Sequence, residues 1–343
     1  MSTNAPNVTI FDIASAAGVS VTTVSRILNN KPDVSAKTVA KVHAVMAQME
    51  YQPHASARRL ASGRSKVIAV LPHATAGEPG SVTYDYITGI VDAAEEQDYS
   101  VTLLPRSTTH EKLRALFIAG QFDGVALLQV QTNDWRVQSL RQSGKPFVLL
   151  GRTEDVEGLS FVDVDLVRGA RELVDMIVEA GHRRIALIGN ALHQKVRRFS
   201  AGLLHEGYQA GMAAHGLAPQ VIDAEFNIEG VVEAIKAGLA ARPAPSCFFI
   251  GGHVAMAQIL NRLRLEGIEV PRHASLVSIL PESVAETTAP RITTIDLPGR
   301  ELGLQVGRIL LQQVTGKTGV TQTLLPPVLT WRDSVRTMQE GES

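Results

Sequence analysis

The sequence has one cysteine, few aromatic residues (5%) and no long apolar run. A single Cys247 excludes an intramolecular disulfide and a metal site built from clustered cysteines. No apolar stretch reaches the roughly 18 residues typical of a membrane span, and the amino end lacks a basic segment followed by a hydrophobic one. We therefore expect a cytoplasmic protein that does not enter a membrane.

Motifs of common enzyme classes are also missing. The sequence has no Gly-x-Gly-x-x-Gly turn, no Gly-x-Ser-x-Gly elbow, no complete Gly-x-x-x-x-Gly-Lys-Ser/Thr phosphate loop and no His-Glu-x-x-His pair. Cys247 begins an apolar run and His182 lies at a helix–strand junction, where structural roles are expected. We predict no enzymatic activity, no metal and no cofactor.

What the sequence does have is an uneven distribution of charge. The formal net charge is −1, but residues 1–66 carry eight Lys or Arg against three Asp or Glu. The remainder carries 25 basic residues against 31 acidic ones. A basic segment joined to an acidic body is typical of a protein that binds a polyanion.

Three short helical patterns occupy the start of the basic segment. Thr9 and Asp12 form a capping box for the first helix, Gly18 permits a turn, and Ser20 and Ser35 cap the second and third helices. The apolar positions predicted to pack together are Ile10, Ile13, Ala14, Ala17, Val24, Ile27, Leu28, Val39, Val42, Met46 and Met49. The pattern predicts an all-α helix-turn-helix domain.

The second helix carries short side chains and one arginine away from its apolar stripe. Val21, Thr22, Ser25 and Arg26 are predicted to project at or near that opposite side. Short side chains at the front of a helix allow close approach to base edges, and an arginine can donate two hydrogen bonds to a guanine. This face therefore predicts binding in the major groove of double-stranded DNA.

Residues 8–66 resemble the DNA-binding head of the LacI/GalR family. The resemblance rests on Thr9 to Asn30 and on the segments "KPDVSAKTVAKV" and "YQPHASARRLASGRS". It implies that Val21 and Thr22 choose the operator sequence and that Arg26 is the shared base reader. The phosphate contacts that it implies, which position the helix without reading sequence, are Thr9, Ser20, Thr23 and Asn29.

The segment "PHASARRLASGRS" resembles the hinge of the same family. Pro53 can begin a helix but not occupy its interior, and Ala57 and Leu60 lie three residues apart. The resemblance implies a helix that forms on DNA, where two copies enter the minor groove and Leu60 wedges between base pairs. A helix this short is not stable in the free protein.

From residue 67 onward, strand-like apolar runs alternate with amphipathic helices. Runs at 67–72, 101–105, 124–130 and 147–151 form one set, and runs at 184–189, 247–251 and 275–280 form another. Two such sets predict two α/β lobes with parallel sheets. "EAGHRRIALIG" and "LPGRELGLQVGRILLQQVTG" resemble the periplasmic-binding-protein-like core of the same family.

The predicted organisation has three parts: a helix-turn-helix domain at 1–52, a hinge at 53–66 and a two-lobed effector-binding and dimerisation core at 67–343. The resemblance implies one lobe at about 67–163 and 297–318, and another at about 166–292 and 323–335. Its three crossings between lobes are expected near 163–166, 292–297 and 318–323. Little sequence follows the last predicted strand, so we expect a homodimer, although a tetramer stays open.

Ligands of open α/β sheets bind beyond the carboxyl ends of the strands, which places a small-molecule effector between the lobes. Leu204, Gly252–His253 and Leu280 stand where sugar-binding relatives carry polar or charged residues. The effector-binding candidates near strand ends are His73, Tyr84, Arg106, Gln129, Arg152, Arg168, His253 and Glu282. The segment "PHATAGEPG" resembles regulators of sugar catabolism, which favours a sugar or sugar-derived effector.

The sequence thus predicts a ligand-responsive transcriptional regulator, a repressor of a carbohydrate catabolic operon that binds a palindromic operator as a dimer. Whether the effector induces or corepresses stays open, because both use the same architecture. A stand-alone solute-binding protein would leave residues 1–66 without a role and would need an export signal. An enzyme would need one of the missing motifs.

Overall fold

The computed structural model describes residues 8–28, 33–51, 64–73, 80–189, 199–252, 255–317 and 319–339. The predicted contact residues Asn29, Ala57, Leu60 and His253 lie outside these ranges. The chain divides into two units, one of residues 1–66 with 116–123 and one of residues 67–115 with 124–343. Within the described ranges no single helix is long and apolar enough to span a membrane. The short helices Ile10–Ala17 and Val21–Leu28 reach that length and apolarity only together, as a pair bent by 107°.

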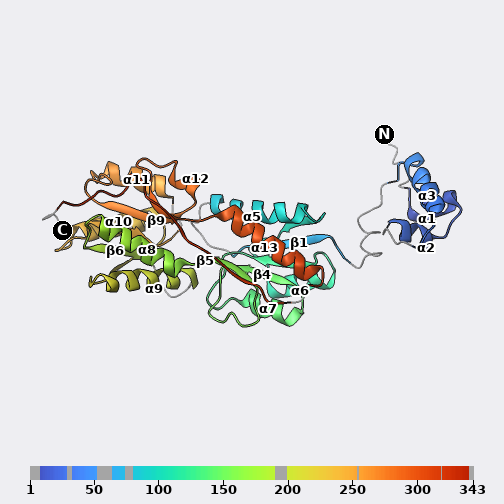
Figure 1. Cartoon of the computed structure of the whole chain (residues 1–343), viewed down its shortest axis with the longest axis horizontal. Helices are drawn as coiled ribbons and strands as arrows, with labels where there is room; N and C mark the ends of the chain where they lie inside the picture. Colours follow the sequence, from blue (N-terminus) through green and yellow to red (C-terminus); the bar gives the residue numbers. More distant parts are fainter. Residues whose placement is uncertain are drawn as a thin grey trace. The chain divides into compact units, whose positions relative to one another are not determined.

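Among its described residues before position 52, the first unit contains three short helices (Figure 1). They are α1 (Ile10–Ala17), α2 (Val21–Leu28) and α3 (Ala36–Gln48). Their small apolar core consists of the buried residues Ile13, Ala14, Ala17, Val24, Ile27, Val42 and Tyr51. The predicted seam is confirmed, with Ile10, Leu28, Val39, Met46 and Met49 half-buried around it.

Hydrogen bonds at the helix ends confirm the predicted caps of this unit. The Thr9 backbone N–H donates to Asp12 Oδ2 at 2.8 Å, and the Asp12 N–H donates to Thr9 Oγ1 at 3.4 Å. The Thr9 hydroxyl also donates to Asp12 Oδ2 at 2.6 Å, and this bond, together with the one from the Thr9 N–H, lowers the pKa of Asp12. Gly18 ends α1 with φ at 64°, a left-handed conformation that favours glycine. Ser20 Oγ accepts from the Thr23 N–H at 3.1 Å and so caps α2.

The second unit is built on two six-stranded sheets. The first sheet has the order β11-β5-β4-β3-β1-β2 and is parallel throughout. Its strands are β1 (Val67–Leu71), β2 (Ser100–Leu103), β3 (Gly124–Leu127), β4 (Phe147–Leu150), β5 (Phe161–Val164) and β11 (Gln322–Leu325). The inner strands of this sheet are buried along their length, as Gly124–Leu127 shows, whereas the edge strands β2 and β11 are partly exposed.

The second sheet has the order β12-β10-β9-β8-β6-β7, with β12 antiparallel to β10. Its strands are β6 (Ile185–Gly189), β7 (Gln220–Asp223), β8 (Cys247–Ile250), β9 (Ser275–Leu280), β10 (Thr293–Asp296) and β12 (Val328–Thr330). The fold class predicted from the sequence, a helix-turn-helix unit with a two-lobed parallel α/β core, is confirmed.

Helices cover both faces of each sheet (Figure 1). On the first sheet, α5 (Gly80–Glu95) packs against α13 (Gly299–Val314), while α6 (His110–Ile118) and α7 (Trp135–Ser143) lie on the other side. On the second sheet, α8 (Leu166–Glu179) pairs with α9 (Phe199–Ala214), and α10 (Ile228–Ala240) with α11 (Met256–Leu265). The short α12 (Glu282–Ala285) follows β9.

The chain passes between the two sheets three times: after β5, between β10 and α13, and between β11 and β12. The third passage was expected at 318–323 but occurs at Pro326 and Pro327, because residues 322–325 pair with β5 in the first sheet. Two consecutive residues without a backbone N–H end one strand before the next begins. The apolar run "TLLPPVLT" therefore supplies a strand to each sheet.

Glycines bring the backbones of α5 and α13 into direct contact. A Cβ placed on Gly303 would lie closer to the Tyr86 carbonyl oxygen than van der Waals contact allows. A Cβ on Gly89 would clash with the Arg300 carbonyl oxygen for the same reason. A Cβ on Gly307 would lie 2.6 Å from the Cβ of Ala93. The contact between the two helices thus requires glycine at all three positions.

We predict that Gly303→Ala lowers the free energy of unfolding by roughly 1–3 kcal/mol, because backbone atoms opposite it cannot move aside easily. Gly202→Ala is the matched control, since a Cβ on this glycine of α9 meets nothing within 4 Å. That control should stabilise by up to about 1 kcal/mol through helix propensity. Urea unfolding measures both, and equal effects of the two substitutions would contradict the close packing.

Candidate nucleic-acid interface and ligand region

The predicted base-reading face lies on α2. Thr22 and Arg26 are exposed, as predicted, and Val24 and Ile27 are buried on the opposite side. Val21, however, is half-buried and packs against the apolar core of the first unit. Val21 therefore projects less than Thr22 and Arg26, because it lies three residues before Val24 and shares part of its face.

Two hydroxyls predicted to contact phosphate form the start of α2. Ser20 Oγ and Thr23 Oγ1 lie 2.8 Å apart, next to the capping bond between the same two residues. Ser20 is exposed and Thr23 half-buried, and Thr9 is exposed at the start of α1. Helix starts expose backbone N–H groups and carry a partial positive charge, which suits a phosphate oxygen.

Arg26 forms an exposed ion pair with Asp33 in the DNA-free chain. Its Nη2 lies 2.6 Å from Asp33 Oδ2, and the side chains are 54% and 46% exposed. Exposed pairs contribute little stability, because water solvates both partners well. The guanidinium can therefore exchange this carboxylate for a guanine edge or a phosphate at small cost.

Four of the effector candidates lie at the carboxyl ends of strands, as the sequence predicts. His73, Arg106, Gln129 and Arg152 follow β1, β2, β3 and β4, four strands that are neighbours in the first sheet. In a parallel sheet these ends share one edge, so the structure brings the four residues to the same side of the lobe. Three further candidates, Tyr84 on α5, Arg168 in the first turn of α8 and Glu282 at the start of α12, lie on helices.

The candidates differ in what holds their side chains. Gln129 has a positive φ of 56° and donates from Nε2 to Thr83 Oγ1 at 3.3 Å. Arg168 donates to Glu172 on the surface of α8, and Tyr84 is 69% exposed. Leu204 and Leu280, which the family resemblance places at polar positions of the ligand site, are both buried in apolar cores.

Arg152 pairs with a carboxylate that the sequence analysis did not single out. Its Nε donates to Asp163 Oδ2 at 2.8 Å, and its guanidinium carbon lies 5.7 Å from the centre of the Phe161 ring. Burial raises the pKa of Asp163, against the opposing influence of Arg152. This pair lies on the two strand ends nearest to the first crossing between sheets.

A second pair, Asp134 with Arg136, was also missed. Both side chains are buried, and Arg136 Nε donates to Asp134 Oδ1 at 2.9 Å. Arg136 also donates to the carbonyl oxygens of Leu71 at 2.8 Å and Leu128 at 3.0 Å, at the ends of β1 and β3. It therefore ties α7 to two neighbouring strand ends. Asp134 Oδ1 also caps α7 by accepting from the Arg136 N–H at 3.0 Å, and nothing in the sequence marks Arg136 as buried.

Cys247 and His182 have structural surroundings. Burial raises the pKa of the Cys247 thiol, and burial lowers the pKa of His182, whose ring bonds Ser246 Oγ at 2.8 Å and the Arg336 carbonyl at 3.0 Å. Among the described residues, no group of three or more His, Cys, Asp or Glu could hold a metal ion.

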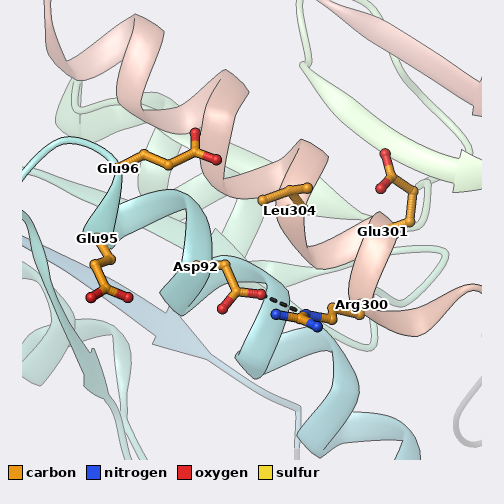
Figure 2. A pocket seen from close by; sticks show the side chains of 6 residues that line it. All are labelled: Asp92, Glu95, Glu96, Arg300, Glu301 and Leu304. Carbon is orange, nitrogen blue, oxygen red and sulfur yellow. Dashed lines mark hydrogen bonds and ion pairs between the residues drawn. The ribbon is translucent and has the colours of Figure 1, made fainter.

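Two hollows open on the first lobe, outside the predicted position between the lobes. One, of about 730 Å³, lies between α5 and α13. Figure 2 shows Leu304 between these helices and Arg300 bonded to Asp92, at 2.7 Å, with Glu95, Glu96 and Glu301 around them. The other, of about 540 Å³, includes Arg106 and Trp135 and lies between the start of α6 and α7.

Comparison with known proteins agrees with this architecture. Residues 9–54 match the family described as bacterial regulatory proteins, lacI family, and residues 174–335 match the periplasmic binding protein-like domain. Fold and matches together define a DNA-binding transcriptional regulator and not an enzyme. The chain thus joins a DNA-binding domain of the lacI family to a periplasmic binding protein-like domain.

Relatives of this class match along nearly the whole chain. Catabolite control protein A of Priestia megaterium is 24% identical over 338 residues, covering 96% of this chain and 100% of that protein. The HTH-type transcriptional regulator CelR of Thermobifida fusca is 29% identical over 317 residues, covering 89% and 92%.

Solved structures show the same fold. The complex of the transcriptional regulator CelR with cellobiose has a TM-score of 0.68 at 27% identity and covers 95% of this chain and 99% of that one. The Lac repressor dimer, bound to operator and the anti-inducer ONPF, has a TM-score of 0.80 at 23% identity, with 96% and 99% covered.

We predict that Asp134→Asn destabilises the chain by about 3–5 kcal/mol, because Arg136 would be left as a buried charge without a carboxylate. Burial by itself would raise the pKa of Asp134, but Arg136 and two backbone N–H groups outweigh it and lower that pKa. The stabilisation is therefore complete above the ordinary Asp range and is lost as the pH falls through the lowered pKa.

Urea unfolding at neutral and acidic pH tests this, with Asp155→Asn as the control. Asp155 pairs with Arg141 at 3.2 Å, but both side chains are exposed, so its loss should change little. A neutral-pH loss for Asp134→Asn no larger than that of the control would refute the role of the buried pair.

Proposed function

We propose that the chain is a repressor that binds a palindromic operator as a homodimer. A sugar or sugar derivative that binds between its lobes lowers or raises its affinity for the operator. The observation that carries this is α2 itself. It is capped at Ser20 and packed by Val24 and Ile27, and it presents Thr22 and Arg26 to solvent. A helix of this kind fits the major groove.

In the proposed complex, base edges are read by Val21, Thr22 and Arg26, with Val21 limited to the part of its side chain that the core leaves exposed. The phosphate contacts are Thr9, Ser20, Thr23 and Asn29. Ala57 and Leu60 enter the minor groove from the hinge. Asn29, Ala57 and Leu60 lie outside the described residues, so their roles rest on the resemblance alone.

A homodimer is supported by the edges of the two sheets. β2 ends the first sheet and β7 ends the second, and each bonds a single neighbouring strand among the described residues. Both present exposed apolar side chains, Leu103 at 57% and Val221 at 36%. Edge strands with apolar residues favour burial against another chain, and a second copy would also bring two heads to a two-fold symmetric operator.

A sugar effector is supported by the relatives. One solved structure is a complex of CelR with cellobiose, and ExuR of Bacillus subtilis, named a probable repressor, is 27% identical over 335 residues. His73, Arg106, Gln129 and Arg152 on the first lobe, with Glu282 and His253 on the second, are the proposed contacts. A ligand that prefers one arrangement of the lobes would shift the affinity for DNA, and DNA would shift the affinity for the ligand by the same factor.

We predict that Arg26→Ala weakens binding to the selected operator by about 1–3 kcal/mol, because a bidentate bond to guanine is lost. Binding to random duplexes should weaken much less. The operator comes from selection on randomised duplexes, and fluorescence anisotropy measures the affinities. Arg272→Ala, on the surface of the second lobe with its side chain 75% exposed, is the matched control and should change neither affinity. An equal loss on operator and random DNA would mean that Arg26 contacts only phosphate.

We also predict that at least one ligand from a panel of sugars, sugar phosphates and sugar acids raises the melting temperature of the full chain. A ligand that binds the folded state alone stabilises by about 2.7 kcal/mol at a hundred times its dissociation constant. Differential scanning fluorimetry measures the shift, with matched polyols as controls for unspecific stabilisation. Stabilisation by no member of the panel beyond the polyol controls would contradict a sugar effector.

A further inference from the structure

The hollow between α6 and α7 lies wholly on the first lobe, away from the second sheet. One wall is formed by residues 106–109, which precede α6, and by the first two residues of α6, and the other wall is formed by α7. Trp135, at the first turn of α7, is 39% exposed and lines the hollow. Its ring centre lies 6.5 Å from that of His110, with 32° between the planes. The hollow therefore has an aromatic wall.

The same side of α7 offers hydrogen-bonding groups next to that ring. Ser139 lies one turn after Trp135, is 8% exposed and lines the hollow, and its hydroxyl bonds no other described residue. Gln138 and Gln142 lie four residues apart on one helix face, and both amides line the hollow. Amides and hydroxyls can each donate and accept, which matches the hydroxyl groups of a polyol.

The charges around the hollow balance. Arg106 is basic, while Glu111 is acidic, and a bond to its own backbone N–H, one from Thr109 and the nearby His110 lower the pKa of Glu111. Glu111 is therefore ionised at neutral pH, and its charge offsets that of Arg106, so the hollow favours neither an anion nor a cation. An apolar ring face beside neutral hydrogen-bonding groups suits a ligand with one apolar face and many hydroxyls.

We propose that this hollow is a second ligand site and that it binds a neutral saccharide, with the apolar face of a sugar ring against Trp135 and its hydroxyls bonded to Gln138, Ser139 and Gln142. The proposal does not depend on the effector between the lobes, and the two sites share one candidate residue, Arg106, which also lines this hollow. Arg136, the residue after Trp135, holds the ends of β1 and β3 from the buried side of the same helix. A saccharide on α7 therefore binds the helix that fixes those strand ends.

The two tryptophans of the chain make the site directly observable. Trp135 and Trp331 are equally exposed, at 39% each, but Trp331 follows β12 in the second sheet. Trp331→Phe leaves Trp135 as the only tryptophan, and Trp135→Phe leaves Trp331. Each full-length variant is titrated with glucose, maltose, cellobiose and sucrose, and tryptophan fluorescence is recorded. We expect a saturable change with at least one saccharide in Trp331→Phe and none in Trp135→Phe.

A second comparison separates direct contact from a distant effect of ligand bound between the lobes. In the Trp331→Phe background, Gln138→Ala with Gln142→Ala should weaken the saccharide at least tenfold. Gln312→Ala, an exposed glutamine of α13 outside the hollow, should leave the affinity unchanged. Calorimetric titration of the same glutamine variants with both tryptophans present checks the result without fluorescence. Absence of a saturable Trp135 signal, or equal affinity in the glutamine variants, would overturn the site.

Discussion

Direct backbone contact between α5 and α13 is the constraint on which the two-lobed body depends. Helix α13 follows β10 of the second sheet, yet it packs on the first sheet, where Gly89 and Gly303 let the two helices touch. The first lobe is therefore complete only when the last third of the chain returns to it. Three crossings join the lobes, and each lobe keeps its own sheet. Such an arrangement allows the lobes to move as rigid bodies about short connections.

The ion pairs are of two kinds: buried pairs stabilise the fold, and exposed pairs can change partners. Arg136 and Asp134 are buried, and Arg136 fixes the carbonyls at the ends of β1 and β3, the edge where ligands of parallel sheets bind. Arg26 and Asp33 are half-exposed, so their pair can open when DNA offers a better partner. An ion pair of this kind therefore fixes strand ends when it is buried, and it leaves the arginine free to change partners when it is exposed on α2.

Local signals in the sequence predicted local structure well. The Thr9–Asp12 box, Gly18 and the Ser20 cap are set by neighbours a few residues apart, and the apolar runs of the body predicted seven of the twelve described strands, β1 to β4 in the first sheet and β6, β8 and β9 in the second. Features that depend on distant chain segments could not be predicted in this way. The burial of Arg136 depends on carbonyls 65 and 8 residues away, and the hollow on α7 depends on the loop after β2. The third crossing lies later in the chain than predicted, because residues 322–325 pair with β5 in the first sheet.

The central claim is that a small DNA-binding head is governed by ligand binding to a separate two-lobed body. The most direct measurement is the affinity of the full chain for its selected palindromic duplex across a range of salt, with the stabilising ligand absent and then saturating. The account predicts affinity that falls steeply with salt, because phosphate contacts release counterions, and a ligand-dependent shift of the whole curve. Weak binding without salt dependence, or two superimposed curves, would contradict it.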